Sequence, residues 1–589
     1  MTNTKTGNKN EIIKGLTADK LLGKAIIKNS KYLVCLVLVS VVSGILSSLD
    51  PVFYRKIIDD AIPNKNVNML LICIALMALI PLVNMAVNSL DQILGFKFSN
   101  GCERDMRAYL FAKILRMNYP AFMRIGPVKL MSFITRSIGR INTKYLNTEL
   151  KSALSNSIQL IIIFIILFRY NKIVAIVTFA VVPLIFFGIK IFRNKIAETE
   201  QRFLSNLNNG DKFFLQVFNG MKTVRSYSGQ EKEMEEMDRW LDNNSKYRLS
   251  ADKVHMLARF FIPTAVSQIV LGCIFTACAF TVMKDSMTIG TMVAIISYVP
   301  KLIRNIESLM SVEVGKAAIS KTLEDLNSIL SEEDEYNSGD ENETLTVGDF
   351  AFNNVDFTYG RENFDLKIEN LEIEKGDFVT IVGTTGGGKS SIMDIINKYY
   401  PITSGSVTLG GKSIDEIDTK ALRAHIGTMF QDVYMFNGTI AENIAYPEKP
   451  DMDKINEVMK KAQLAEFVDK LPNKAEEIVE TGGENFSGGE CQRMALARML
   501  YKDSDIYLLD EPTAALDAGT SKSIFDMLAQ ENKNGKTIIA ITHDAGKATY
   551  GNKVLVVNGG RIVESGSPEE LLKENGAFAS LYSAQMKMA

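Results

Sequence analysis

Six apolar stretches constrain this chain more than any other feature, because each is near the roughly 20 residues that a helix needs to cross a bilayer. They lie in series before about residue 312, at 31–54, 67–94, 154–168, 173–192, 260–283 and 287–310. A soluble protein rarely carries so many such runs one after another, so we expect six membrane-spanning helices. Beyond residue 312 the sequence reads as a soluble domain. The 589 residues also exceed what a single core organises.

The loops between these stretches predict how the chain is oriented. The segments after the second and fourth stretches are long and basic, whereas the loops after the first, third and fifth are short. Positive charge favours the cytoplasmic side, so both chain ends and the long loops are expected there. Over the whole chain, 66 Lys and Arg balance 68 Asp and Glu, which gives no support for nucleic acid as a partner.

The composition along the chain predicts four parts. Residues 1–30 form a cytoplasmic N-terminus with an amphipathic elbow helix, and residues 31–330 form the membrane domain. Residues 331–345 form an acidic linker that is too polar to bury a core. In residues 346–589, short β-rich runs alternate with helical ones, which predicts an α/β domain with a parallel-rich sheet. The expected fold class is therefore multidomain, with an all-α six-helix transmembrane domain and an α/β P-loop domain.

A phosphate-binding loop is the strongest single motif. The apolar strand Phe378–Val382 leads directly into GTTGGGKS, which fits G-x-x-x-x-G-K-[ST] in the strand-to-helix context that the motif requires. Glycines let backbone N–H groups surround a phosphate, and the helix N-terminus favours the same anion. Lys389 is expected to reach the β- and γ-phosphates of ATP, and Ser390 to bind Mg²⁺. The expected ATP-binding residues of this segment are Gly383, Thr384, Thr385, Gly386, Gly387, Gly388, Lys389, Ser390 and Ser391.

A second apolar strand, Ile506–Leu509, ends in Asp510 and Glu511. It would deliver both carboxylates to the sheet edge beside the phosphate loop. We expect Asp510 to hold Mg²⁺ through water and Glu511 to polarise the attacking water. Alone, such a strand end is common. Together with the phosphate loop, it predicts an ATPase.

The segment Phe486–Ser487–Gly488–Gly489–Glu490 resembles the L-S-G-G-Q signature of the ABC transporter family. From about residue 17 to its end, the chain resembles half-transporters of the exporter type. The resemblance implies that this signature binds the γ-phosphate of an ATP held by a second half-transporter, so that the chain works as a dimer. Phe486 replaces the usual Leu and Glu490 the usual Gln. A homodimer is favoured, and a heterodimer with a different half stays open.

The resemblance also assigns roles outside these motifs. It implies that Tyr359 stacks on adenine, that Gln431 senses the γ-phosphate and binds Mg²⁺ with Ser390 and Asp510, that Asp517 communicates across the dimer, and that His543 contacts the γ-phosphate and is catalytic with Glu511.

The resemblance further implies export of a hydrophobic or amphipathic drug, lipid or peptide by alternating access, across what we expect to be a bacterial cell membrane. A siderophore-type importer and an ATP-gated channel or regulator are the alternatives. In the sixth stretch, Lys301 and Arg304 suggest a cavity for an anionic or amphipathic head group. They could instead snorkel to the inner interface or pair with Glu307.

Overall fold

The computed structural model describes residues 17–335, 345–360 and 365–586. Within these ranges, most side chains between 173 and 193 are not described. The chain divides into two compact units. One comprises Met1–Met117 and Ile125–Glu332, and the other comprises Asn118–Arg124 and Glu333–Ala589. Most of the acidic linker lies outside the described residues.

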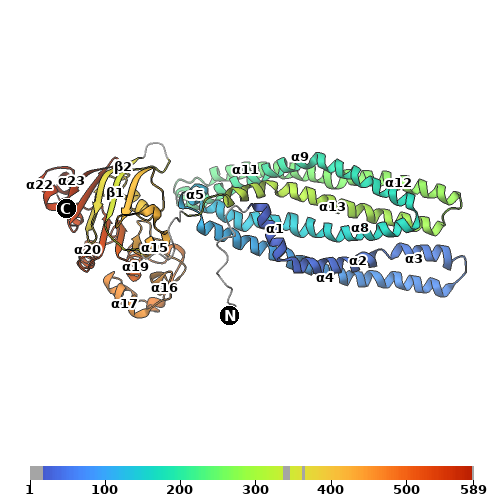
Figure 1. Ribbon diagram of the computed structural model, residues 1–589, viewed down its shortest axis with the longest axis horizontal. Helices are drawn as coiled ribbons and strands as arrows, with labels where there is room; N and C mark the ends of the chain where they lie inside the picture. Colours follow the sequence, from blue (N-terminus) through green and yellow to red (C-terminus); the bar gives the residue numbers. More distant parts are fainter. Residues whose placement is uncertain (1–16, 336–344, 361–364, 587–589) are drawn as a thin grey trace. The chain divides into compact units, whose positions relative to one another are not determined.

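The first unit is helical (Figure 1). Its α-helices are α1 (Ala18–Lys28), α2 (Ser30–Ser47), α3 (Asp50–Lys56), α4 (Val67–Arg116), α6 (Pro127–Ser132), α7 (Ile138–Ile141), α8 (Lys151–Tyr170), α9 (Lys172–Asn219), α10 (Met221–Ser226), α11 (Gln230–Met256), α12 (Ile262–Met283) and α13 (Ile289–Leu330). Turns of π-helix join several of these helices, at Ile57–Ala61, Phe133–Ser137, Asn142–Leu150 and Leu257–Phe261.

The predicted membrane stretches fall on these helices. Among the residues that were searched, four helical segments are long and apolar enough to cross a bilayer: Ser30–Ala61, Val67–Arg116, Pro127–Tyr170 and Ile289–Leu330. A shorter apolar helix covers Ser267–Met283, within the fifth stretch. The fourth stretch falls in α9, where most of its side chains lie outside the described ones.

Large apolar side chains on these helices point away from the unit. Leu38 is 63% exposed, Leu82 66% and Ile161 58%. Such surface is costly in water and favourable in lipid, and helices satisfy their own backbone hydrogen bonds there. The helices α4 and α9 also continue far beyond their apolar stretches, into the long basic segments that follow them.

The second unit is built on a mixed ten-stranded sheet in the order β5-β4-β1-β2-β12-β11-β3-β10-β9-β6. The strands of the chain are β1 (Phe350–Phe357), β2 (Leu366–Ile373), β3 (Phe378–Gly383), β4 (Ser404–Leu409), β5 (Lys412–Ser413), β6 (Ile426–Met429), β7 (Gly438–Thr439), β8 (Ile478–Val479), β9 (Ile506–Asp510), β10 (Thr537–Ile541), β11 (Lys553–Asn558) and β12 (Arg561–Gly566). Strands β7 and β8 form a separate two-stranded ladder.

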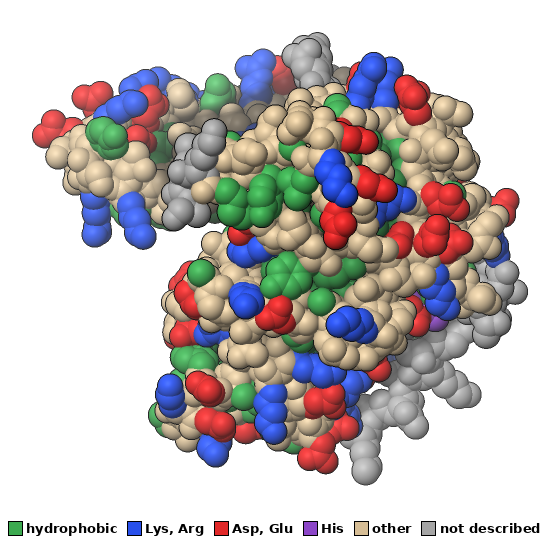
Figure 2. All heavy atoms as spheres, turned by 90° about the vertical axis from the view of Figure 1, so that its left-hand side faces the viewer, with side chains coloured by type: hydrophobic (Ala, Val, Ile, Leu, Met, Phe, Trp, Pro, Cys, Tyr) green, Lys and Arg blue, Asp and Glu red, His purple; other side chains and the backbone are tan. Residues whose placement is uncertain are grey.

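Helices belong to this unit as well, and all of them except α5 follow β3 in the sequence. They are α5 (Tyr119–Ile125), α14 (Lys389–Ile396), α15 (Thr419–Ala424), α16 (Ile440–Ala445), α17 (Met452–Lys461), α18 (Ala465–Val468), α19 (Gly488–Lys502), α20 (Ala518–Lys533), α21 (Ala545–Ala548), α22 (Pro568–Lys573) and α23 (Ala577–Met586). On the face turned to the viewer in Figure 2, the described Lys, Arg, Asp and Glu side chains are interspersed.

The strands β11, β3, β10, β9 and β6 pair in parallel, whereas β1 pairs antiparallel with β2 and β4. The parallel strands β3, β9 and β10 are nearly continuous apolar runs because both of their faces are covered, and separate cores lie on them. Their carboxyl ends share one edge, which is where an open sheet of this kind binds its ligands.

Candidate ATP site and membrane cavity

The phosphate loop follows β3 and closes around its own lysine. The Lys389 ammonium donates to the carbonyl oxygens of Gly383, at 3.1 Å, and Thr384, at 2.9 Å. Burial lowers the pKa of Lys389, so an anion beside it would be strongly favoured. At Gly383 the backbone has φ 147°, and a Cβ there would lie 1.8 Å from the Val557 carbonyl oxygen. Only glycine fits that position.

Two predicted Mg²⁺ ligands meet beside this loop. The Ser390 hydroxyl, on the first turn of α14, donates to the Asp510 carboxylate at the end of β9, at 2.7 Å. Burial raises the pKa of Asp510 and Glu511 adds to the effect, while the Ser390 hydrogen bond opposes it. A carboxylate whose charge is disfavoured by burial gains from a cation. A hydroxyl and a carboxylate are oxygen donors of the type that Mg²⁺ prefers, so these residues fit the ion.

Glu511 lies where three segments converge. Its backbone adopts φ 51°, and its N–H donates to the Ile541 carbonyl oxygen at 3.0 Å. One carboxylate oxygen lies 2.7 Å from Nε2 of His543, which follows β10. The other accepts a hydrogen bond of 3.3 Å from Gln431, which follows β6. The fold therefore brings together the acid, the histidine and the glutamine that lie apart in the sequence.

Tyr359 is anchored on the helix that follows the phosphate loop. Its hydroxyl lies 2.7 Å from the Asp394 carboxylate and 3.0 Å from the Ser391 hydroxyl, both on α14. Its ring packs edge-on to Tyr400, with the ring centroids 4.9 Å apart. The predicted aromatic contact for adenine is thus held close to the phosphate loop.

The signature segment forms the N-terminus of α19. Ser487 and Glu490 make a capping box, in which the Ser487 N–H donates to the Glu490 carboxylate at 2.7 Å and the Glu490 N–H donates to the Ser487 hydroxyl at 3.3 Å. Phe486 packs on Phe467, with ring centroids 6.0 Å apart. At Gly489 a Cβ would lie 2.9 Å from the Ala515 carbonyl oxygen, so this turn approaches the segment after β9 closely.

Asp517 caps the next long helix. Its carboxylate accepts from the Thr520 N–H at 2.9 Å, and hydrogen bonding by the Thr520 side chain, followed by this backbone bond, lowers the pKa of Asp517. Among the predicted residues, one hydrogen-bonded group therefore surrounds Glu511 and another surrounds Ser487, and Asp517 lies at the start of α20.

Gln492, to which the sequence analysis assigned no role, connects the signature helix α19 to Glu511 and to the segment after β9. Its amide donates to the Glu511 carbonyl oxygen at 2.9 Å and accepts from the Ala515 N–H at 3.0 Å. The side chain is 5% exposed. The only signal in the sequence was its place directly behind the signature.

A polar cavity of about 530 Å³ lies among the membrane helices α2, α4, α8 and α13. Its lining is rich in Ser, Asn and Gln, and it includes Arg304 and an ion pair of 3.0 Å between Lys151 and Asp91. Lys301 also lines it, and its ammonium lies 3.3 Å from the Asp50 carboxylate. The ion partner of Lys301 is thus Asp50, not the Glu307 considered from the sequence.

Comparison with known proteins assigns both units to one family of transporters. Residues 33–306 match the family model for the ABC transporter transmembrane region, and residues 366–514 match the model for the ABC transporter. The ATP-dependent lipid A-core flippase of Salmonella typhimurium is 30% identical over 485 residues, which are 82% of this chain and 82% of that protein. The chain belongs to the ABC transporter family.

Two further comparisons describe this ABC transporter. The lipid A-core flippase of Escherichia coli K12 is 29% identical over the same share of both chains. A solved structure of a bacterial Atm1-family ABC exporter with ATP bound shares the fold, with a TM-score of 0.87 and 22% identity over 94% of this chain and 98% of that one. The predicted fold class is confirmed. The protein is an integral membrane ATPase coupled to transport, with the exporter architecture.

Proposed function

We propose that two copies of this chain form an exporter for an amphipathic molecule with an anionic head group. The polar cavity carries this proposal. Three basic side chains line it, of which Lys151 pairs with Asp91 and Lys301 with Asp50, and Arg304 is the third. Intramembrane charges are costly unless they face a partner or a cavity. The relatives named as lipid A-core flippases support a lipid among the possible substrates.

Within this proposal, the group around Glu511 hydrolyses ATP. Glu511 would accept a proton from the attacking water, and His543 and Gln431 would hold the carboxylate and sense the γ-phosphate. Lys389 and the phosphate loop would bind the β- and γ-phosphates, and Tyr359 would stack on adenine. Bound at Ser390, Asp510 and Gln431, Mg²⁺ would neutralise charge on the phosphates.

The signature group would complete the ATP site of a second copy. A capped helix start with two glycines is an anion-binding surface. Ser487, Gly488 and Gly489 would place this surface around the γ-phosphate of the partner chain's nucleotide. Asp517 would lie at that dimer contact. The domain boundaries at residues 30, 330 and 345 belong to the same proposal, as does a bacterial inner membrane with the second unit in the cytoplasm.

The first experiment is ATP hydrolysis by the chain alone in lipid vesicles with Mg²⁺. Glu511→Gln should lower turnover about 10²–10⁴-fold, because it removes the general base. Glu570→Gln, a capping glutamate far along the chain, is the control. Robust turnover that survives in Glu511→Gln would contradict the assignment.

The substrate is tested with the same vesicles. Anionic amphiphiles should stimulate hydrolysis more than cationic ones, and the double variant Lys301→Gln/Arg304→Gln should lose that difference. Lys284→Gln, in the turn between α12 and α13, should keep it. Unchanged stimulation in the double variant would refute the role of this cavity in binding an anionic head group.

A further inference from the structure

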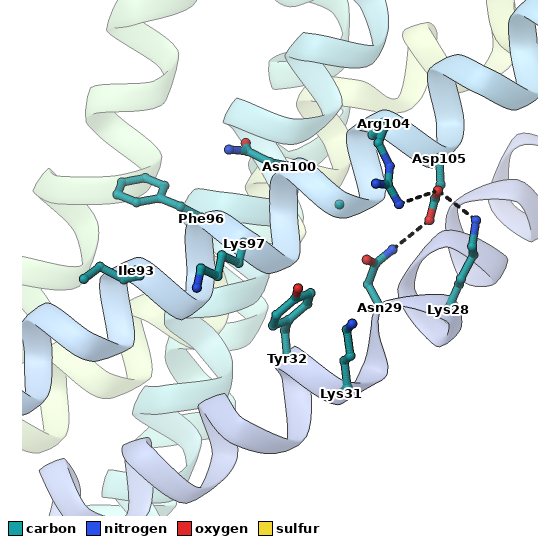
Figure 3. A pocket seen from close by; sticks show the side chains of 11 residues that line it. Lys28, Asn29, Lys31, Tyr32, Ile93, Phe96, Lys97, Asn100, Arg104 and Asp105 are labelled. Atoms are coloured by element: carbon teal, nitrogen blue, oxygen red, sulfur yellow. Dashed lines mark hydrogen bonds and ion pairs between the residues drawn. The ribbon is translucent and has the colours of Figure 1, made fainter. Parts of the chain in front are cut away.

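A second cavity, of about 670 Å³, lies where α1, α2 and α4 meet, and it shares no lining residue with the polar cavity. Figure 3 shows it from close by. We propose that it binds the phosphate-bearing head group of an anionic phospholipid from the cytoplasmic leaflet. Four basic side chains line it against one acid, Asp105. The basic residues are Lys28, Lys31, Lys97 and Arg104.

The floor of this pocket is built before any ligand binds. Asn29, between α1 and α2, donates to Asp105 at 3.0 Å and to the Ala25 carbonyl oxygen at 2.9 Å. A Cβ at Gly101 of α4 would lie 2.3 Å from the Asn29 side-chain oxygen. This glycine lets the helix junction approach α4 closely enough for the hydrogen bond to form. A head group would therefore meet a rigid surface, which reduces the entropy cost of binding.

The charge at the pocket is unbalanced. Lys28, at 2.9 Å, and Arg104, at 3.4 Å, share the single carboxylate of Asp105. That carboxylate is 7% exposed, whereas the Lys28 and Arg104 side chains are 65% and 77% exposed. Their outer surfaces can still face an anion. One buried acid thus leaves a positive rim.

Lys31 and Lys97 extend from α2 and α4 toward the space between the two helices, as Figure 3 shows. The Lys31 ammonium lies 4.9 Å from the centroid of the Tyr32 ring. Within residues 17–335, the structure gives neither lysine an ion pair. A phosphate between these ammonium groups would accept charge-assisted hydrogen bonds from both.

The depth of the pocket in the bilayer favours a lipid over a soluble anion. The apolar run of α2 begins directly after Tyr32, and Lys97 follows the end of the apolar stretch of α4. Both apolar runs therefore end at this pocket, at the level of lipid head groups and on the side that positive charge marks as cytoplasmic. Ile93 and Phe96, each about half exposed, add an apolar wall for the glycerol and first methylene groups.

Native mass spectrometry of the full chain in neutral detergent tests whether the pocket binds this lipid. No nucleotide is added, so the result is independent of transport. Short-chain dioctanoyl phosphatidylglycerol should bind more tightly than dioctanoyl phosphatidylcholine. Each of Lys31→Gln and Lys97→Gln should weaken phosphatidylglycerol binding about fivefold, and the double variant about 25-fold, since each basic residue near a lipid surface contributes on that scale. Binding of phosphatidylcholine should change little.

Lys20→Gln, which removes an exposed lysine of α1 outside the pocket, is the matched control. Equal binding of the two lipids, or single and double variants that bind phosphatidylglycerol as Lys20→Gln does, would overturn the proposal. Inorganic phosphate that displaces phosphatidylglycerol at equal concentration would overturn it as well, because the site would then serve a soluble anion. The single variants keep the test decisive if the double variant does not fold.

Discussion

Individual residues at the carboxyl edge of the sheet are the ones proposed to carry the chemistry, and their neighbours set how they are held. Glu511 adopts φ 51°, a left-handed conformation that is uncommon for a non-glycine residue. Two hydrogen bonds of its backbone keep it there: its N–H donates to the Ile541 carbonyl oxygen, and its own carbonyl oxygen accepts from the Gln492 amide. Such an over-determined position is typical of residues whose side-chain direction matters.

Gln492→Ala should lower both stability and turnover. Two hydrogen bonds to a buried amide are lost, and the free energy of unfolding of the second unit should fall by about 1–3 kcal/mol. Turnover should fall at least about tenfold, because small displacements of a catalytic group are costly. Gln530→Ala, at an exposed position on α20, is the control for chemical denaturation and ATPase assays. Wild-type turnover in Gln492→Ala would show that this bridge does not position Glu511.

Glu490→Gln should improve ATP binding. The carboxylate caps Ser487 within the segment that is proposed to meet a phosphate, and one like charge at close range costs about 1 kcal/mol in water, which is about fivefold in affinity. The KM for ATP should therefore fall about fivefold, while the helix loses a favourable terminal charge worth less than about 1 kcal/mol.

The control for this change is chemically matched. Glu570 forms the same capping box with Ser567 at the start of α22. Glu570→Gln should show the same small loss of stability and an unchanged KM. An equal KM for Glu490→Gln and the wild type would mean that the departure from the usual signature carries no electrostatic cost.

At the scale of elements, the sequence predicted the parts whose signal is local. The strand-loop-helix from Phe378 to Ile396 is confirmed, because an apolar run, a glycine loop and a helix start lie next to each other. The sequence did not predict that β1 pairs antiparallel with β2 and β4, since this pairing depends on contacts between distant parts of the chain. The break after Ser47, where α2 gives way to α3, lacks a helix-breaking signal before Pro51. The convergence of Gln431, Glu511 and His543 came only from resemblance.

The short helix α5 belongs to the second unit although the residues on either side of it in the sequence belong to the first. It lies between α4 and α6 in sequence but groups with the second unit, where the Tyr119 ring lies 5.2 Å from Tyr399 and 5.6 Å from Tyr400. We expect Tyr119→Ala to leave basal ATP hydrolysis within about twofold and to abolish its stimulation by substrate, because it removes two aromatic contacts that hold α5 in the second unit, each worth about 0.5–1.5 kcal/mol beyond its area. Tyr247→Ala, at an exposed position on α11, should retain stimulation. Normal stimulation in Tyr119→Ala would show that the aromatic contacts of α5 are not needed for substrate to stimulate ATP hydrolysis.

At the scale of the whole molecule, the decisive question is whether the two groups of the ATP site belong to different chains. Complementation answers it. Lys389→Ala removes the phosphate-loop lysine, and Gly488→Asp places a carboxylate in the signature. A Cβ at Gly488 would meet only the Ala515 side chain, at 3.8 Å, so this substitution should not disturb the fold.

Each variant alone should be inactive as a homodimer, since both of its sites carry the defect. Mixed before reconstitution, half of the dimers would pair one variant with the other and hold one intact site. Turnover should then return to at most about a quarter of the wild-type value, as twofold symmetry requires. ATP hydrolysis by the mixture, against each variant alone at equal total protein, measures this. If each site were built within one chain, mixing would restore nothing, and activity in the separate variants would contradict the paired site directly.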